Sequence, residues 1–403
     1  MRASGILMPI SSLPSAHGIG AMGAEARRFV EFLSKAGQAY WQILPICPTS
    51  YGDSPYQSFS TFAGNPYFID LDELAKRGLL LPEEYENIDW ESAPDTINYG
   101  ALYEKRYKVL RCAANRLLAK PNAAYRKFVK ENAFWLPDYA LFMALKLPTE
   151  VAGCPPDGFS ATGQLWGNPL FDWDAMAKTG YAWWVRRIRH MCSIYDVVRI
   201  DHFRGFAGYY AIPYGDKTAE HGRWREGPGY ALFAAIKKKL GSPRIIAEDL
   251  GFLTEDVNAL LKECGYPGMK VLEFAFDSRD GGDYRPHSYP NNCIAYVGTH
   301  DNEPVNGWME TAAPEDVERA VRYLNLTKKE GYHWGMMRGV WSSVADLAVV
   351  QAQDVLGLGH ESRMNTPSTL GGNWCWRAEP EVFNSRLARR LHGLMELYGR
   401  LPE

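Results

Sequence analysis

Short apolar segments alternate with amphipathic helical segments along most of this 403-residue chain, and this alternation restricts the fold more than any other feature. A strand, a helix and a further strand in repeated succession are typical of a parallel sheet covered by helices. Strands are expected at residues 5–10, 40–46, 196–201, 243–248, 269–274, 293–297 and 349–355. Helices are expected at residues 23–37, 182–194, 229–240, 254–264, 314–325, 334–348 and 381–398. The pattern predicts an α/β fold in which residues 1–403 form one (β/α)8 barrel with insertions.

Two long segments interrupt the alternation and are expected to be insertions in the barrel. One covers about 47–146 and joins an aromatic loop to a helical block at 99–146, and the other, at about 155–180, is a loop expected to cover a cleft. Both contain aromatic residues beside Gly, Asn and Pro, as in "SYGDSPYQSFSTFAGNPYF" and "GQLWGNPLFDW". Aromatic rings in polar loops are suited to stacking on a ligand such as a sugar, although composition alone leaves core packing open.

The overall composition excludes several classes of partner and location. The net charge is −3 without a long run of one sign, so nucleic acid and anionic membranes are not expected partners. The seven cysteines are scattered and form no C-x-x-C pair, which is typical of reduced thiols in the cytoplasm. The sequence has neither the apolar core of a signal peptide nor a run of ~20 apolar residues. We therefore expect a cytoplasmic protein without a metal site.

Three predicted strands end in an acidic residue. Asp201 ends "VVRID", Glu248 follows "RIIA", and Asp301 follows "YVGTH". Each acid alone could be structural, as half of an ion pair, a helix cap or a turn residue. Barrel enzymes, however, carry their catalytic groups at the carboxyl ends of strands, and a pair of carboxylates there is typical of glycoside chemistry.

The strand before Asp201 also predicts how this carboxylate is held. Side chains alternate along a strand, so Val197, Arg199 and Asp201 share one face, while Val198 and Ile200 share the other. If the second face packs on helices, Arg199 and Asp201 point into the barrel mouth. Arg199 would then favour the ionised carboxylate that a nucleophile requires.

The acid-bearing segments "VRIDHFRGF", "AEDLG" and "GTHDNE" resemble the catalytic segments of the α-amylase clan. Longer segments resemble one family of that clan, the 4-α-glucanotransferases (amylomaltases or disproportionating enzymes) of glycoside hydrolase family 77. They include "SSLPSAHGIG", "YWQILPICPTSYGDSPYQSFSTFAGNPYFIDL", "GMKVLEFAFD" and "RMNTPSTLGGNWCWR". The resemblance extends over nearly the whole chain, in order.

The resemblance implies a role for each acid. Asp201 would be the nucleophile, Glu248 the general acid/base with a raised pKa, and Asp301 a third carboxylate that holds sugar hydroxyls. The family retains anomeric configuration through a covalent intermediate, so Asp201 and Glu248 should have carboxyl groups ~5–5.5 Å apart. The chemistry requires no cofactor.

The resemblance also implies substrate contacts for maltooligosaccharides and α-1,4-glucans. These contacts are Arg199 and His300 at the cleavage point, Ser54 and Tyr56 at the donor, Gln164, Trp166 and Asn168 in the cleft-covering loop, Asp277 and Asn365 at further sugars, and Tyr51 and Tyr103 at a second glucan groove. Trp166 alone retains a structural alternative, as a hydrophobic plug. A monomer or weak homodimer is expected.

Transfer and hydrolysis share the first chemical step. A sugar hydroxyl outcompetes water only where subsites bind it and a loop excludes solvent, and the two aromatic loops suit that task. The segment after Asp301 is accounted for by helices and one strand, so no C-terminal β-sandwich of the ordinary α-amylases is expected. Transfer is therefore favoured, and the alternatives are an α-glucan hydrolase and a non-catalytic glucan-binding barrel.

One departure from the family pattern lies near Lys146 and Leu147. There the family has further residues and a barrel strand that ends in a Gly-Asp-Ile/Met-Pro segment, and the strand is absent here. Either the natural molecule carries a segment that this sequence omits, or the protein is a shortened form. A barrel without one strand would have open edges.

Overall fold

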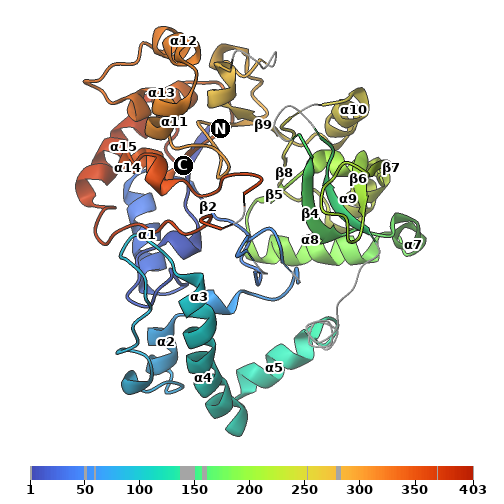
Figure 1. Ribbon diagram of the computed structural model, residues 1–403, viewed down its shortest axis with the longest axis vertical. Coiled ribbons are helices and arrows are strands. Elements are labelled where there is room, and N and C mark those ends of the chain that lie inside the picture. The colour runs from blue at the N-terminus through green and yellow to red at the C-terminus, as the bar shows by residue number, and fades with distance from the viewer. Residues whose placement is uncertain are drawn as a thin grey trace. The chain divides into compact units, whose positions relative to one another are not determined.

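The computed structural model describes residues 2–49, 52–58, 60–136, 150–156, 161–251, 253–277, 283–369 and 371–402 (Figure 1). The chain forms two compact units. Unit 1 consists of Met1–Leu141, Val271–Asn291 and Ala295–Glu403, and unit 2 of Phe142–Lys270 and Asn292–Ile294. Each unit is described by itself.

A parallel sheet lies at the centre of unit 1. It has the order β2-β1-β11-β10-β9, formed by β1 (Ala3–Leu7), β2 (Tyr40–Gln42), β9 (Gly268–Val271), β10 (Cys293–Tyr296) and β11 (Leu347–Gln351). Strand β1 is parallel to both neighbours, with Ile6 opposite Trp41 on one side and Val350 on the other. The division between the units falls within β9 and β10. Every residue of β10 is buried, as expected for a strand covered on both faces.

Most helices of unit 1 bury apolar residues, whereas α5 (Ala123–Glu131) has no buried residue. The helices of unit 1 are α1 (Ala24–Lys35), α2 (Leu71–Lys76), α3 (Tyr99–Ala101), α4 (Tyr107–Ala119), α5 (Ala123–Glu131), α11 (Val305–Thr311), α12 (Pro314–Leu324), α13 (Tyr332–Trp341), α14 (Ala352–Leu356) and α15 (Ser385–Leu397). In α1, Phe29, Phe32 and Leu33 are buried at the spacing of one helix face. Helix α2 begins where the Asp70 side chain accepts the Glu73 N–H, a standard N-cap.

Unit 2 combines an antiparallel sheet with a short parallel pair. The sheet has the order β4-β3-β6-β7, formed by β3 (Glu150–Cys154), β4 (Gln164–Pro169), β6 (Gly208–Pro213) and β7 (Arg223–Glu226). The parallel pair is β5 (Val198–Ile200) and β8 (Ile245–Ala247). The helices are α7 (Trp173–Lys178), α8 (Ala182–Ile194), α9 (Tyr230–Leu240) and α10 (Glu255–Cys264). A buried core containing Trp184, Ile188, Phe203, Phe233 and Ile245 joins these helices to the parallel pair.

The predicted parallel sheet and alternating α/β order are confirmed, with differences at the ends of elements. Helix α8 has the predicted bounds, whereas the segment expected to be a strand at 349–355 divides into the end of β11 and helix α14. The antiparallel sheet was not predicted, because its strands are short and lie in Gly- and Pro-rich segments typical of loops. Closure of a barrel stays a prediction, and the segment around Lys146, at 137–149, lies outside the described residues.

Among the helices of the described ranges, none is both long and apolar enough to cross a lipid bilayer.

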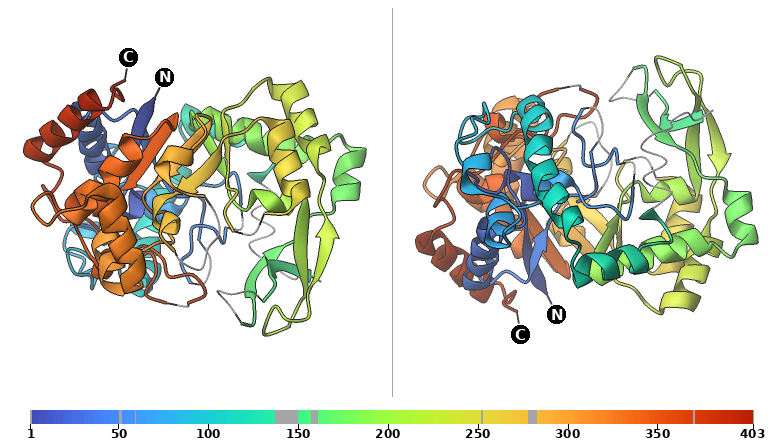
Figure 2. Two further views of the ribbon diagram at one scale, coloured as in Figure 1. Left: turned by 90° about the horizontal axis from the view of Figure 1, so that it is seen from above. Right: turned by 90° about the horizontal axis from the view of Figure 1, so that it is seen from below.

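Arg400, near the C-terminus, hydrogen-bonds to Ala3, near the N-terminus. The N- and C-terminal segments lie side by side (Figure 2). The fully buried guanidinium of Arg400 donates to the carbonyl oxygens of Trp341 at 2.7 Å, Ala3 at 2.8 Å, Ser343 at 3.0 Å and Ala345 at 3.1 Å. Buried carbonyl groups that lose their donor are destabilising.

We expect Arg400→Met to lower the free energy of unfolding by about 3 kcal/mol or more, because several buried carbonyl groups lose their donors together. Arg400→Lys, which keeps the charge and some of the donors, should lie between the variant and the wild type. Chemical denaturation monitored by tryptophan fluorescence provides the measurement. An unfolding free energy equal to that of the wild type would contradict this role of Arg400.

Candidate active site

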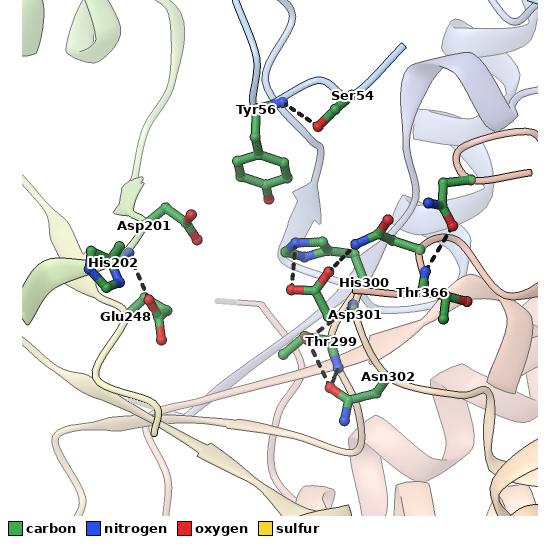
Figure 3. Close-up of polar contacts among 12 residues, drawn as sticks. Ser54, Tyr56, Asp201, His202, Glu248, Thr299, His300, Asp301, Asn302 and Thr366 are labelled. Carbon is green, nitrogen blue, oxygen red and sulfur yellow. Dashed lines mark hydrogen bonds and ion pairs between the residues drawn. The ribbon is translucent and has the colours of Figure 1, made fainter. Parts of the chain in front are cut away.

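Two of the predicted acids follow neighbouring parallel strands in unit 2. Strands β5 and β8 pair with Ile200 opposite Ala247, so Asp201 and Glu248 leave the sheet at the same end (Figure 3). The Glu248 N–H donates to the Ile200 carbonyl at 3.0 Å, which continues the ladder to the acid itself. Ile200 packs against the buried core of the unit, as the predicted alternation requires.

Arg199 holds the carboxylate of Asp201. Its Nη1 donates to Asp201 Oδ1 at 2.6 Å, and its Nε contacts Met269 Sδ at 3.3 Å. The Arg199 side chain is 16% exposed and that of Asp201 50% exposed. A largely buried guanidinium therefore orients a carboxylate that solvent, or a ligand, can reach.

The carboxyl group of Glu248 is fixed by two backbone donors. Oε2 accepts the His202 N–H at 2.7 Å, and Oε1 accepts the Leu250 N–H at 2.9 Å. Burial, followed by the negative charge of Asp201, raises the pKa of Glu248 to about 7, although Arg199 and the two N–H groups oppose the shift. Near neutral pH this group can therefore both donate and accept a proton, as a general acid/base must.

His202 connects the acid to strand β4. Its backbone is left-handed, with φ 49°, and its N–H points to Glu248. Burial lowers the pKa of His202 to about 4, so the imidazole is neutral. Its ring packs edge-to-face on Trp166 at 4.8 Å, and Trp166 Nε1 donates to Gln164 Oε1 at 3.1 Å.

The segment predicted to be a cleft-covering loop contains a strand, β4. Gln164, Trp166 and Asn168 alternate with exposed residues and share its half-buried face. The structure therefore places the three predicted contacts on one side of one element, and Trp166 on His202. Arg204, to which the sequence assigned no role, lies with its guanidinium 4.5 Å from the centre of the Trp224 ring.

In unit 1, Asp301 follows β10 and is held by three contacts, of which Figure 3 shows the one with His300. Its Oδ1 accepts Asn365 Nδ2 at 2.6 Å, its Oδ2 lies 3.3 Å from His300 Nε2, and its carbonyl accepts Arg363 Nη2 at 2.7 Å. The His300 side chain is 5% exposed and the Asp301 side chain 44% exposed. The cluster thus presents one oriented carboxylate.

Aromatic rings surround His300. Tyr56 stacks on the imidazole at 5.0 Å with an interplanar angle of 17°, and the Trp374 ring lies 5.9 Å away. Ser54 Oγ accepts the Tyr56 N–H at 3.3 Å and shapes the turn that presents this ring. Ser54, Tyr56, His300, Asp301 and Asn365 are therefore brought together in unit 1.

The other predicted residues are more scattered. Asp277 follows the short helix Leu272–Ala275, and its N–H donates to the Phe274 carbonyl at 3.3 Å. Tyr103 is 71% exposed and packs edge-to-face on Tyr107, and Tyr51 lies outside the described residues. No group of three or more His, Cys, Asp or Glu side chains in the described ranges is placed to hold a metal ion.

Three contacts were not predicted from the sequence. These are Arg363 on the Asp301 carbonyl, Trp374 beside His300, and the His202 N–H on Glu248. Arg363 and Trp374 both lie in the segment "RMNTPSTLGGNWCWR", so its richness in Arg, Asn and Trp was the available signal. The third contact is made by the backbone N–H of His202, and no pattern of side chains in a sequence indicates a backbone donor.

The chain matches a family model described as 4-alpha-glucanotransferase, of glycoside hydrolase family 77, over residues 8–152 and 146–382. It is 43% identical to the 4-alpha-glucanotransferase of Clostridium butyricum over 485 aligned positions, covering 98% of this chain and 100% of the relative. It is 37% identical to that of Thermus thermophilus over 502 positions, covering 99% of each. Both alignments are longer than the 403-residue chain, so the relatives have positions at which this chain has no residue.

Solved structures are similar as well. An amylomaltase from Streptococcus agalactiae in complex with acarbose has a TM-score of 0.93 and 35% identity, with complete coverage of both chains. An amylomaltase from Corynebacterium glutamicum has a TM-score of 0.74 at 17% identity, covering 100% of this chain and 75% of that one, and supports the fold alone.

Proposed function

This chain belongs to glycoside hydrolase family 77, the 4-alpha-glucanotransferases, and we propose that Asp201 and Glu248 carry out its reaction. The enzyme transfers segments of α-1,4-glucan to the 4-hydroxyl of an acceptor sugar. The observation that carries the assignment is the parallel pair β5 and β8, which places an arginine-held carboxylate beside an acid whose pKa is about 7.

In the first step the Asp201 carboxylate attacks the anomeric carbon of the donor, and Glu248 gives its proton to the departing glycosidic oxygen. The product is a covalent β-glucosyl-enzyme and a shortened glucan, and Glu248 is left ionised. Arg199 holds the attacking group in its orientation. The carboxyl separation expected for this retaining mechanism, ~5–5.5 Å, stays a prediction.

In the second step ionised Glu248 takes the proton of the acceptor 4-hydroxyl, whose oxygen displaces Asp201 with a second inversion. Water competes for the same intermediate, so acceptor sugars must be bound and solvent excluded. We propose that Gln164, Trp166 and Asn168 contact the acceptor from the half-buried face of β4.

We propose that the cluster around Asp301 binds donor sugar. Asp301, held by Asn365 and His300, would act as the third carboxylate, and Tyr56 would offer its ring to a sugar. A similar amylomaltase is known with acarbose bound, which supports a maltooligosaccharide ligand. Three other assignments remain proposals from the family resemblance. They are Ser54 as a donor contact, Asp277 as a contact to a further sugar, and Tyr51 with Tyr103 as a second glucan groove.

The finer predictions about architecture also remain proposals. They are a closed (β/α)8 barrel forming one domain, with insertions at about 47–146 and 155–180, a cytoplasmic location and a monomer or weak homodimer. The family model matches the chain in two parts, residues 8–152 and 146–382, which share residues 146–152. A match in two parts that meet there supports a missing segment near Lys146. The mass of the intact protein, compared with 45.4 kDa for these residues, distinguishes an omitted segment from a shortened form.

Incubation with maltotriose tests the proposed function. Transfer is expected to give glucose together with oligomers longer than maltotriose, because one substrate molecule accepts the segment removed from another. Chromatographic separation of the products provides the measurement. Glucose and maltose alone would indicate an α-glucan hydrolase, and retained starch binding without products would indicate a glucan-binding barrel.

A further inference from the structure

The loop that carries His300 and Asp301 is held by two buried acidic residues, Glu273 and Asp354, to which no catalytic role has been assigned. At its start, the Glu273 N–H donates to the Val297 carbonyl at 3.1 Å, and the Glu273 side chain hydrogen-bonds to Asn302. At its end, Asp354 Oδ1 accepts the Val305 N–H, the first residue of α11, at 2.7 Å. Glu273 is 3% exposed and Asp354 is completely buried.

The backbone at the start of the loop is closely packed at Gly298. A Cβ on Gly298 would lie 2.9 Å from Asn302 Cβ and 3.0 Å from both Gln351 Nε2 and Glu273 Oε1. Gln351 also donates to the Glu303 carbonyl at 3.4 Å, farther along the same loop. Asn302 in turn accepts the Thr299 N–H at 2.9 Å and closes the turn around His300 and Asp301 (Figure 3).

The charges around Glu273 do not balance if all its acidic neighbours are ionised. Asp354 and Glu303 both raise its pKa, and among the described residues only Arg363 is a cation that lowers it. Arg363 already binds the Glu303 carboxylate through a short Nη1 contact, and Glu303 also accepts His360 Nδ1 at 3.0 Å. Within the described ranges neither Glu273 nor Asp354 forms a salt bridge with a cation, and burial of a carboxyl group without one favours its protonated form.

Three buried oxygen atoms at this place have no hydrogen-bond partner among the described residues. They are Glu273 Oε1, Gln351 Oε1 and Asp354 Oδ2. The amide oxygen is always an acceptor, and the two carboxyl oxygens are acceptors only while their groups are ionised. A Cβ placed on Gly298 would lie 3.0 Å from both Glu273 Oε1 and Gln351 Nε2, so the Glu273 carboxyl group and the Gln351 side chain border the same glycine. Protonation would turn the partnerless Glu273 oxygen from an acceptor only into an O–H group that can donate.

We propose that Glu273 is a positioning residue that keeps its proton at neutral pH and, together with Asp354, holds the loop that presents His300 and Asp301. Only the expected effect on turnover rests on the proposed function, in which Asp301 contacts the donor sugar. Burial, with the charges of Asp354 and Glu303, raises the pKa of Glu273, and burial raises that of Asp354 to about 7.

Glu273→Gln tests the protonation state, because glutamine is neutral and of the same shape. The infrared difference spectrum between the wild type and this variant at about pH 7 should contain the carbonyl stretch of a protonated carboxylic acid, lost in the variant. Glu318→Gln, an exposed change of the same kind on α12, should instead lose a carboxylate band. Loss of only a carboxylate band in Glu273→Gln would overturn the proposal, whatever the enzyme's activity.

The pH dependence of stability gives a second readout. Glu273 has a folded pKa above its unfolded value of 4.5, so its stabilising contribution is complete below 4.5 and is lost as pH rises through the folded pKa. The thermal midpoint of Glu273→Gln, relative to wild type, should therefore rise as the pH increases above 4.5. Parallel curves for Glu273→Gln and wild type would contradict the proposal.

Turnover of maltotriose separates positioning from simple packing. Glu273→Gln should stay within about threefold of the wild-type kcat at neutral pH, whereas Glu273→Ala should lower kcat by roughly tenfold to a hundredfold with a smaller change in KM. If Glu273→Ala does not fold, the spectrum and stability of Glu273→Gln still decide the matter. If Glu273→Gln is folded but its kcat is as low as that of Glu273→Ala, then Glu273 does not carry a proton in the native enzyme.

Discussion

Asp201→Asn is expected to abolish glucan transfer, with a fall in kcat on maltotriose of about 10⁴-fold to 10⁶-fold, the range seen when a covalent nucleophile is removed. The amide has nearly the shape of the carboxylate, yet it cannot form the ester to the anomeric carbon. The fold should survive, because the Asp201 side chain is half-exposed and its pairing with Arg199 lies at the end of β5. Initial rates measured by product chromatography, with circular dichroism as the test of folding, are sufficient.

Two comparisons make the Asp201 result specific. Asp196→Asn makes the same chemical change at an exposed position a few residues before β5 and should leave turnover unchanged. A glucosyl fluoride donor, whose fluoride leaves without protonation, should not rescue Asp201→Asn, because the missing group is the attacking one. Near-native turnover of Asp201→Asn on maltotriose would exclude Asp201 as the nucleophile.

The pairing of Arg199 with Asp201 could be predicted because it depends only on the local period of a strand. Residues two positions apart share a face, and the apolar Val198 and Ile200 between them indicate which face is inside. The same reasoning located Glu248 and Asp301 after their strands. Such predictions require no knowledge of which strands are neighbours, and the pairing of β5 with β8 came from the structure.

The features that could not be predicted depend on contacts between distant segments. Strand β3 pairs with β6, and its Gly153 has no space for a side chain because Gln164 O of β4 lies 2.2 Å from a Cβ placed there. A glycine with this purpose looks the same in sequence as a loop glycine. The raised pKa of Glu273 likewise arises from its burial and from the charge of Asp354, which is far along the chain and approaches Glu273 only in the folded protein.

Removal of the second carboxyl group, by Glu248→Gln, should lower kcat/KM on maltotriose by about 10²-fold to 10⁴-fold, the usual contribution of a general acid/base. Glutamine cannot give a proton to the glycosidic oxygen or take one from the acceptor. Glu263→Gln makes the same chemical change at an exposed position on α10. As the matched control it should leave kcat/KM unchanged.

The sign of the pH dependence follows from the raised pKa of Glu248. In the free enzyme the group must be protonated for the first step, so kcat/KM of the wild type should fall about tenfold per pH unit above about 7. With a glucosyl fluoride donor the first step requires no proton, so Glu248→Gln should still form the covalent enzyme, and this formation should lose its dependence on pH near 7. Detection of that intermediate by intact mass in Glu248→Gln, and its absence in Asp201→Asn, would separate the two roles. If neither variant accumulated the covalent intermediate from the glucosyl fluoride, the assignment of Asp201 as nucleophile and Glu248 as general acid/base would be contradicted.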